Sequence, residues 1–332
     1  MNDLENKVRA LGLCSGGLDS ILSAVVLRNQ GIAVEWIAFE TPFFSSDKAR
    51  RASERLHIPL TVQNITTPYL EMLRDPPCGY GQNMNPCMDC HAMMFRLAGQ
   101  VMADRGMDFL FSGEVLGQRP MSQTRSSLHY VEKHSGYRGI IVRPLSARLL
   151  EETLPEKQGL VNRERLLGLS GRSRKPQIHL AQEWGITDYP APAGGCLLTE
   201  PVFSRRLKDL FDHQADCTEN ELHLLKYGRH IRLNPQVKII VGRTLQDNTA
   251  ILDLRDPLRD TMLKTVRIPG PVVLIPSDAG MDDVAQAASI CAGYTKAAGQ
   301  APVDVDISSP TAARTLQVTP ISPETIQDRL IG

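Results

Sequence analysis

A glycine-rich turn near the N-terminus constrains the fold of this chain more than any other feature. The segment Ser15–Ser20 (SGGLDS) follows the apolar run Val8–Cys14 and precedes a helical pattern over Asp19–Asn29. A buried strand that enters a turn and then a helix is typical of parallel α/β sheets. Two glycines let the backbone approach a ligand closely, and the unpaired N–H groups of a first helical turn favour anionic oxygens. The sequence therefore predicts a phosphate-binding loop, without the Walker or GxGxxG spacing.

Short apolar runs alternate with helical patterns through the first 145 residues. We expect strands at Val8–Cys14, Val34–Phe39, Leu60–Ile65, Phe109–Ser112 and Ile140–Arg143, and helices at Asp19–Asn29, Asp47–Leu56, Tyr69–Leu73 and Asp89–Arg105. This alternation predicts an α/β fold with a doubly wound, mostly parallel sheet covered on both faces. Ligands of such sheets bind at the carboxyl ends of strands, where Ser112–Gly117 lies.

The pattern changes after about residue 204, and a smaller α+β domain follows. Helices are expected at Ser204–Phe211, Glu219–Lys226 and Asp282–Tyr294, with strands at Val237–Val241, Ala250–Leu254 and Val272–Ile275. We therefore predict a first domain over residues 1–211, a small α+β domain over 212–305, and a polar, loosely docked tail over 306–332.

The composition, with 42% apolar and 22% charged residues, is that of a globular protein. The chain has no apolar run long enough for a membrane span and no apolar signal core, which predicts a cytoplasmic protein without a membrane partner. Lys+Arg and Asp+Glu both total 37, so bulk charge does not indicate nucleic-acid binding. Local clusters still favour a polyanion surface, at Arg163–Arg165, Arg172–Lys175, Arg205–Lys208 and Lys226–Arg232.

Three cysteines form the second informative pattern. Cys87 and Cys90 make a CxxC at a helix start, and Cys196 lies in a Pro/Gly loop. From spacing alone, three interpretations stay open. These are a 4Fe–4S cluster with one open iron, persulfide and disulfide exchange between Cys90 and Cys196, and structural zinc with Cys78 as fourth ligand. The remaining cysteines are interpreted as small apolar residues, namely Cys14, Cys217 and Cys291.

The motifs together resemble those of a known family. SGGLDS is similar to the SGGxDS loop of the PP-loop ATP pyrophosphatases, which have the adenine nucleotide alpha-hydrolase-like fold. Asn85–His91 and Ala193–Cys196 resemble the two cysteine segments of tRNA 2-thiouridylases. Ser112–Gln118, with Ser122–Thr124 and Arg143–Leu145, resembles the TGExLGQ, SQT and RPL segments of tRNA 4-thiouridine synthetases. The resemblance covers about residues 7–211 and implies a PP-loop tRNA thiouridine synthetase.

Such an enzyme would adenylate a uridine carbonyl oxygen with ATP and replace it with sulfur. The resemblance implies catalytic roles for Cys90, Cys196 and Asp19, the last as a ligand of Mg²⁺. It also implies an ATP site formed by the loop and two strand ends, from Ser15, Gly16, Gly17, Asp19, Ser20, Glu40, Thr41, Gly113 and Gln118, with Ser122 near the target base. The partners would be tRNA and a sulfur donor, either sulfide or a persulfide carrier, with a homodimer as one option.

Two departures refine this expectation. Cys87 occupies a position that is usually Asp in the two-cysteine enzymes, and the set Cys87, Cys90 and Cys196 looks like that of the cluster-dependent members. We therefore expect these three thiolates to hold a 4Fe–4S cluster, with zinc as the alternative. In the standard 4-thiouridine synthetases a tRNA-binding domain precedes the loop, and for this chain we expect none there. Leu224–Pro276 resembles the small RNA-binding module of NFACT-type proteins and would supply the grip on RNA.

Two other functions compete with thiolation. The first is an ATP-dependent amide-forming ligase of the PP-loop class acting on a small molecule, which would need no thiol triad. The second is an RNA-binding protein with a vestigial ATP loop, which the intact loop and cysteines disfavour.

Overall fold

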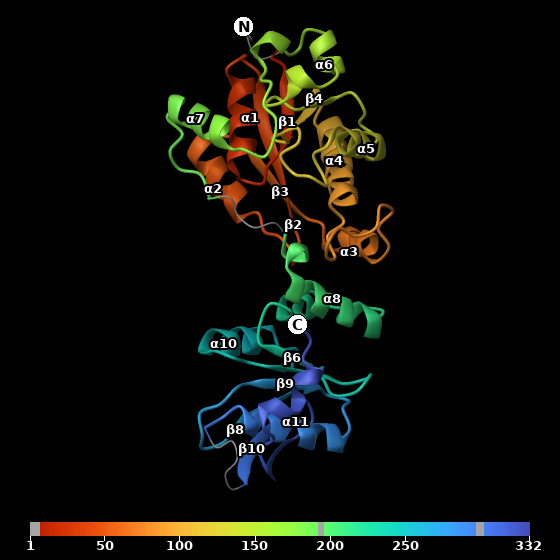
Figure 1. Ribbon diagram of the computed structural model, residues 1–332, viewed down its shortest axis with the longest axis vertical. Coiled ribbons are helices and arrows are strands. Elements are labelled where there is room, and N and C mark those ends of the chain that lie inside the picture. The colour runs from red at the N-terminus through yellow and green to blue at the C-terminus, as the bar shows by residue number, and fades with distance from the viewer. Residues whose placement is uncertain (1–6, 192–195, 297–301) are drawn as a thin grey trace. The chain divides into compact units, whose positions relative to one another are not determined.

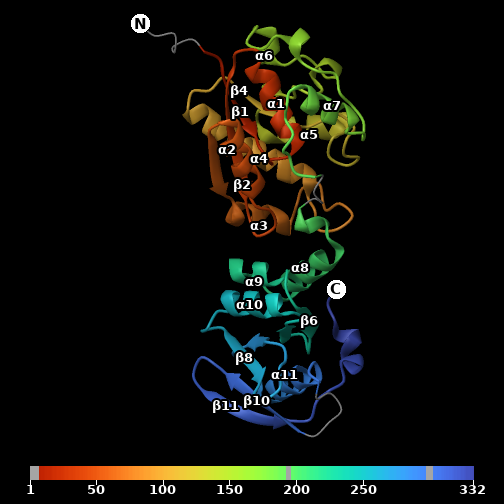
Figure 2. The ribbon, with the colours of Figure 1, turned by 90° about the vertical axis from the view of Figure 1, so that its left-hand side faces the viewer.

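The chain folds into two compact units. The computed structural model describes residues 7–191, 196–296 and 302–332. The units are Met1–Cys196 and Leu197–Gly332, which run from red to green and from green to blue in Figures 1 and 2. The boundary predicted at 211/212 thus lies at 196/197. The reason is helix α8 (Pro201–His213), whose Arg206 donates to the carbonyls of Leu225 and Gly228 inside the second unit.

The first unit is built on a parallel sheet with strand order β3-β2-β1-β4-β5, which confirms the predicted doubly wound α/β fold. Its strands are β1 (Arg9–Leu13), β2 (Ala33–Glu40), β3 (Leu60–Asn64), β4 (Phe109–Ser112) and β5 (Ile141–Val142). The consecutive buried residues of β2, Trp36–Phe39, are typical of a strand covered on both faces. Gly12 of β1 leaves room for Phe111 of β4, because a Cβ there would lie 2.3 Å from the phenyl ring.

Helices cover both faces of this sheet (Figure 1). In the described part of the unit they are α1 (Leu18–Arg28), α2 (Asp47–Leu56), α3 (Thr66–Arg74), α4 (Cys87–Asp104), α5 (Arg125–Ser135), α6 (Leu154–Lys157) and α7 (Lys175–Glu183), with 3₁₀ turns at Ala147–Leu149 and Arg163–Arg165. α7 packs against α1, and α4 packs against α5. The main core lies between α1, α2 and the sheet and contains Trp36 and Phe111.

The second unit contains an antiparallel sheet, with α8 and α9 (Glu219–Leu224) at its start. The strands, in the order β11-β10-β8-β9-β7-β6, are β6 (Arg229–Arg232), β7 (Lys238–Val241), β8 (Asp260–Thr265), β9 (Val273–Pro276), β10 (Val303–Ser308) and β11 (Ala313–Val318). α11 (Met281–Gly293) buries one face of the sheet, and α10 (Leu245–Leu254) packs with α9 on a second core. Further 3₁₀ turns lie at Leu197–Thr199 and Pro323–Arg329.

Two predictions for this unit are wrong. The segment 250–254 is the end of helix α10 and not a strand, because Thr244 caps the helix by accepting from the N–H of Asp247 at 3.0 Å. The segment 306–332 is not a loosely docked tail, because β10 pairs with both β8 and β11. The alternating sequence of β10 buries Val305 and Ile307 in the core, a period-two signal of a strand.

Candidate functional site

The glycine-rich loop lies where the strand order reverses. β2 and β3 extend the sheet to one side of β1, whereas β4 and β5 extend it to the other. The carboxyl ends of β1 and β4 therefore flank the switch point at which such sheets bind ligands. The two segments touch, because a Cβ on Gly113 would lie 2.4 Å from the carbonyl carbon of Asp19. Only a glycine lets the segment after β4 pack so closely on the first turn of α1.

The loop itself is held by backbone packing and internal hydrogen bonds. Gly16 has a φ of +70°, and a Cβ there would lie 2.2 Å from the carbonyl carbon of Lys48 in the first turn of α2. The hydroxyl of Ser20 is buried and donates to the Gly17 carbonyl at 2.8 Å, so it serves the loop's own structure here. Ser15 is exposed, and its hydroxyl accepts from the Gly17 N–H at 3.4 Å. The loop thus presents a preformed backbone with the start of α1 behind it.

Asp19 is oriented by two glutamines from distant parts of the chain. The Gln118 side-chain amide donates to Asp19 Oδ2 at 2.7 Å, and the Gln177 amide of α7 donates to Gln118 Oε1 at 2.8 Å. The other carboxylate oxygen, Asp19 Oδ1, is buried and has no hydrogen-bond partner among the described residues. A buried carboxylate oxygen without a partner is costly, and a hard cation such as Mg²⁺ is a fitting partner for it.

The end of β2 carries the two residues predicted to contact the nucleoside. Glu40 Oε2 accepts from the Ser46 hydroxyl at 2.7 Å and lies 3.9 Å from the Arg50 guanidinium. Thr41 is buried, and its hydroxyl accepts from the Phe43 N–H at 3.1 Å. Both side chains therefore order the turn before α2, beside the loop. Their contact with a nucleoside stays a prediction.

A buried ionic network follows β4. Glu114 accepts from the Arg143 guanidinium at 2.9 Å and lies 2.9 Å from His91 Nδ1 of α4. Arg143, which follows β5, also pairs with Glu132 of α5. Burial alone would raise the pKa of Glu114, but Arg143 and His91 outweigh it and lower the pKa to about 2. Glu114 is therefore a carboxylate at neutral pH, and it fixes His91 directly beside Cys90.

The three predicted cysteines lie in one neighbourhood of the first unit. Cys90 is buried in the first turn of α4, and Cys87 and Cys196 are half-buried. Burial raises the pKa of Cys90 far above its ordinary value, Cys196 raises it further, and a hydrogen bond with Tyr69 opposes part of this change. Burial raises the pKa of Tyr69, and Cys90, Cys196 and Cys87 raise it further.

Cys78 takes a different position from the other three cysteines. Its thiol is exposed, and its backbone N–H donates to Asp89 Oδ2 at 2.9 Å, while the Tyr130 hydroxyl donates to the other oxygen of Asp89. Among residues 7–191, 196–296 and 302–332, no three His, Cys, Asp or Glu side chains are arranged to hold one metal ion. The closed zinc site predicted with Cys78 as fourth ligand is therefore not formed by the side chains as they lie. The predicted loop residues Ala193–Gly195 fall outside the described residues.

The remaining cysteines and the last basic stretch are structural. Cys14 and Cys291 are buried, as expected of small apolar residues, and Cys217 is half-buried. In the stretch 226–232, Arg232 pairs with Asp209 of α8 and Arg229 lies over the ring of Tyr294, 4.6 Å from its centre. These basic side chains stabilise the second unit from within.

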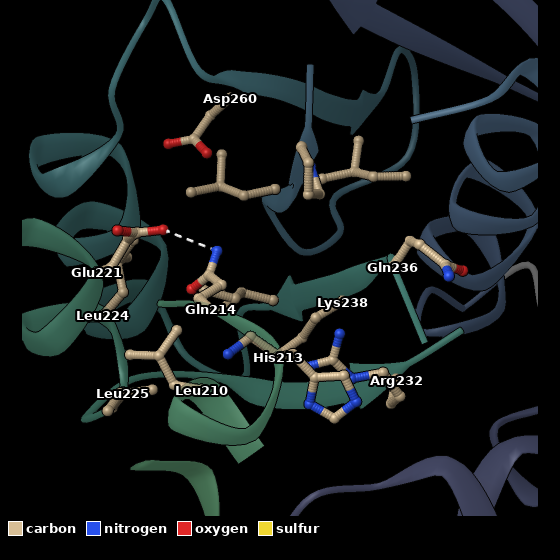
Figure 3. A pocket seen from close by; sticks show the side chains of 14 residues that line it. Leu210, His213, Gln214, Glu221, Leu224, Leu225, Arg232, Gln236, Lys238 and Asp260 are labelled. Carbon is tan, nitrogen blue, oxygen red and sulfur yellow. Dashed lines mark hydrogen bonds between the residues drawn. The ribbon is translucent and has the colours of Figure 1, made fainter. Parts of the chain in front are cut away.

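Figure 3 shows a cavity of about 90 Å³ in the second unit, which Arg232 borders. Arg232, Lys238 and His213 lie on one side of it, and Glu221 and Asp260 lie on others. Burial lowers the pKa of Lys238 to about 8, although Asp209, 3.6 Å away, opposes this change. Because basic and acidic side chains share so small a cavity, we assign these residues a structural role.

Sequence reasoning missed three residues of the site. Glu114 lies inside a quoted motif and received no role, although its place after a buried strand was a usable signal. Tyr69 and Gln177 carry no local signal, because their partners Cys90 and Gln118 are distant in the sequence. In the described part of the chain, no helix combines the length and apolar character needed to cross a bilayer.

Each unit contains a segment that matches the model of a known protein family. Residues 6–152 match the model of the thiamine biosynthesis protein family ThiI, and residues 228–330 match the NFACT protein RNA binding domain. A "Probable tRNA sulfurtransferase" of Oceanobacillus iheyensis is 28% identical over 159 residues, which span 45% of this chain and 38% of that protein. The chain thus spans well under half the length of this curated relative.

Two solved structures are similar to part of the chain. One is a 4-thiouridine synthetase in complex with RNA and bound ATP, which is 20% identical with a TM-score of 0.38, over 54% of this chain and 41% of that one. The other is a predicted subunit of tRNA methyltransferase from Methanocaldococcus jannaschii, 19% identical with a TM-score of 0.35, over 53% of this chain and 76% of that one. The chain thus carries a parallel α/β sheet within a segment that matches the ThiI family model, followed by a segment that matches the model of the NFACT protein RNA binding domain.

Proposed function

We propose that this chain is an ATP-dependent tRNA sulfurtransferase. The observation that carries the proposal is the double contact made by two consecutive residues. Gly113 packs on the backbone of Asp19 at the phosphate loop, and Glu114 holds His91 beside Cys90. The loop and the thiols therefore face the same end of the sheet, where one substrate can meet both. The match to a ThiI-type domain and the curated sulfurtransferase relative support this activity.

The first step in this proposal is adenylation of a uridine. The carbonyl oxygen of the base attacks the α-phosphate of ATP, the bond to the β-phosphate oxygen breaks, and pyrophosphate leaves. Backbone N–H groups of the loop and of the first turn of α1 would bind the leaving pyrophosphate. Asp19 would hold Mg²⁺ through its unpartnered Oδ1, which supplies charge neutralisation for the phosphates. Gln118 orients the carboxylate for that task.

The second step is replacement of the activated oxygen by sulfur. A sulfur nucleophile attacks the ring carbon, and AMP leaves with the former carbonyl oxygen. Cys87, Cys90 and Cys196 would hold a 4Fe–4S cluster, because Cys196 and Cys87 both lie close enough to Cys90 to raise its pKa, and cysteine thiolates are the ligands of such clusters. When bound by three cysteines, such a cluster supplies one iron without a protein ligand. Tyr69 and the buried start of α4 keep the Cys90 thiol away from water.

The RNA partner is proposed on the second unit. Residues 228–330 match an RNA binding domain, and a target uridine must leave its stack to reach the loop. We take the substrate to be tRNA and the sulfur source to be sulfide, or a persulfide carrier whose S–S bond is then cleaved by a second thiol with formation of a disulfide. The cytoplasmic location and the homodimer stay predictions.

The test combines metal content with product analysis. The protein is purified without oxygen, and iron, sulfide and zinc are measured per chain. It is then incubated with ATP, Mg²⁺, sulfide and a tRNA transcript, and AMP and thiouridine are quantified. We expect about four irons per chain, and AMP and thiouridine in equal amounts. Cys196→Ser should lose iron and thiouridine, whereas the matched control Cys217→Ser in the second unit should keep both.

The possible negative results separate the alternatives. AMP formation that needs no tRNA and gives no thiouridine would point to a ligase acting on a small molecule. Absence of AMP with every RNA tested would refute the enzyme and favour a plain RNA-binding role. Stoichiometric zinc that persists in Cys196→Ser would refute the cluster while leaving ATP-dependent thiolation open to the product assay.

A further inference from the structure

Most basic side chains in the clustered stretches of this sequence form contacts with other residues of the chain. Arg163 pairs with Glu156, and Arg165 donates to the carbonyl of Asn29. In the second unit, Arg206 donates to backbone carbonyls at 2.8 and 3.0 Å, and Lys208 pairs with Asp212 at 2.7 Å. In the stretch 226–232, Lys226 contacts His223 at 2.9 Å and Arg232 pairs with Asp209. A polyanion would have to compete with these contacts for the side chains.

One stretch differs from the others. Arg172, Arg174 and Lys175, at the start of α7, form no side-chain hydrogen bond or ion pair with any residue that the structure describes. Arg119 is exposed and equally unpaired. Arg172 and Lys175 are exposed, and Arg174 is half-buried with an Nε that is buried and has no partner. We call these four residues the basic lip. A chain with no net charge thus carries four uncompensated cations in two short segments.

The two segments of the basic lip lie side by side. Leu116 and Ser170 form a parallel bridge, and the Gly171 N–H donates to the Leu116 carbonyl at 2.8 Å. The hydroxyl of Ser146 joins both segments, since it accepts from the Leu116 N–H at 2.9 Å and donates to the Leu169 carbonyl at 2.7 Å. Arg119 and Arg172 therefore project from a backbone that is tied down just before each of them.

The basic lip lies at the mouth of the phosphate loop. Arg119 follows Gln118, whose amide donates to Asp19 at 2.7 Å, and Lys175 precedes Gln177, which donates to Gln118 at 2.8 Å. α7 as a whole packs against α1, the helix that the loop opens. An RNA that inserts a base at the phosphate loop therefore brings its neighbouring phosphates close to the basic lip.

We propose that the basic lip binds the phosphate backbone of the RNA beside the target nucleotide, an inference that rests on the proposed function. Neutralising phosphates releases counterions, which favours binding and makes it depend on salt. A triphosphate is short and has the N–H groups of the loop and of α1 to bind it. A polynucleotide carries one charge per nucleotide and can cross both segments of the lip. We therefore assign the lip to RNA and not to ATP.

The test compares two double variants of the full chain. Arg172→Ala/Lys175→Ala removes two exposed cations of the basic lip. Lys133→Ala/Lys157→Ala removes two exposed, unpaired cations elsewhere in the first unit and is the matched control. Affinity for a tRNA transcript is measured by fluorescence anisotropy between about 50 and 200 mM salt, and ATP affinity is measured by calorimetry without RNA.

We expect the lip variant to lower the slope of log K against log salt by up to about two, since each lost phosphate contact contributes about 0.7 to 0.9. At 0.1 M salt this corresponds to a loss of affinity on the order of 25- to 60-fold, with ATP affinity unchanged. The control should keep the wild-type slope. Equal slopes in all three proteins, or no tRNA binding by the wild type, would overturn the proposal. So would a fall in ATP affinity with unchanged tRNA affinity, which would assign the lip to ATP. Thiouridine formation by the wild type, measured in parallel, tests the proposed function separately.

Discussion

The buried network around Glu114 gives a quantitative prediction for Glu114→Gln. The Glu114 side chain is 7% exposed. Its carboxylate accepts hydrogen bonds from the Arg143 guanidinium at 2.9 Å and from the Ser112 hydroxyl at 3.2 Å, and it lies 2.9 Å from Nδ1 of His91. Glutamine keeps the size of the side chain but removes the negative charge. The Arg143 guanidinium, 3% exposed, would then retain Glu132 as its remaining acidic partner among the described residues. Leaving a buried cation short of a partner is strongly destabilising.

The magnitude follows from the pKa of Glu114. Burial would raise it, but Arg143 and His91 lower it from 4.5 to about 2 in the folded chain. A lowering of about 2.5 pH units corresponds to about 3 kcal/mol of stabilisation. Because the folded pKa lies below the unfolded one, this stabilisation is complete above pH 4.5 and is lost as the pH falls towards 2. At pH 3.5 about 2 kcal/mol of it remains.

The assay uses the placement of the two tryptophans. Trp36 and Trp184 are the only tryptophans of the sequence, and both belong to the first unit. Their emission during urea titration therefore follows the unfolding of that unit. We expect Glu114→Gln to lower the free energy of unfolding by about 3 kcal/mol at pH 7 and by about 2 kcal/mol at pH 3.5.

The matched control is Glu164→Gln, an exposed glutamate of the same unit without an ion pair in the described residues, which should change stability by less than about 0.5 kcal/mol. A difference below about 1 kcal/mol for Glu114→Gln at pH 7 would refute the assigned role of the network. A difference that stays constant with acid would show that its charge is not the cause.

Three further changes probe the loop, the glutamine pair and the thiols. Gly113→Ala places a Cβ 2.4 Å from the carbonyl carbon of Asp19, so ATP affinity in calorimetry should fall at least about tenfold, and an unchanged affinity would contradict the packing. Gln177→Leu removes the donor to Gln118, so the Mg²⁺ concentration for half-maximal ATP binding should rise severalfold, while ATP binding without Mg²⁺ should not change. Cys90→Ser should abolish iron binding but leave ATP affinity intact, and loss of both would show that it disturbs the fold.

Local patterns predicted much of the first unit. Buried strands such as Val34–Phe39 appear as unbroken apolar runs, and the turn at Gly16 and Gly17 marks the first helix start, so the parallel sheet and its loop could be read from neighbouring residues. The helix predicted at 47–56 begins and ends as expected. Such features depend on contacts within a few residues, which a single sequence contains.

The missed features depend on contacts between distant residues or on weak local signals. Nothing in one sequence pairs Glu114 with Arg143 and His91, which lie 29 and 23 residues away, so the network required the fold. The end of α10 was mistaken for a strand because Ala250–Leu254 is apolar, and the cap at Thr244 was overlooked. The strands after residue 302 were missed because their solvent-facing residues, such as Asp304 and Asp306, made the segment look polar.

Because Gly113 and Glu114 are neighbours with different contacts, separate mutations can test the ATP site and the thiol site of the proposed enzyme. Gly113 packs against the backbone of α1 at Asp19. Glu114 contacts His91 of α4, next to Cys90. If one substrate meets both chemistries, loss at either residue must stop thiouridine formation, but only the change at Gly113 should weaken ATP binding. If the phosphate loop and the cysteines served unrelated ligands, at least one of the two changes would leave thiouridine formation intact. The chemical argument for a shared substrate therefore stands on these two contacts more than on the presence of either motif.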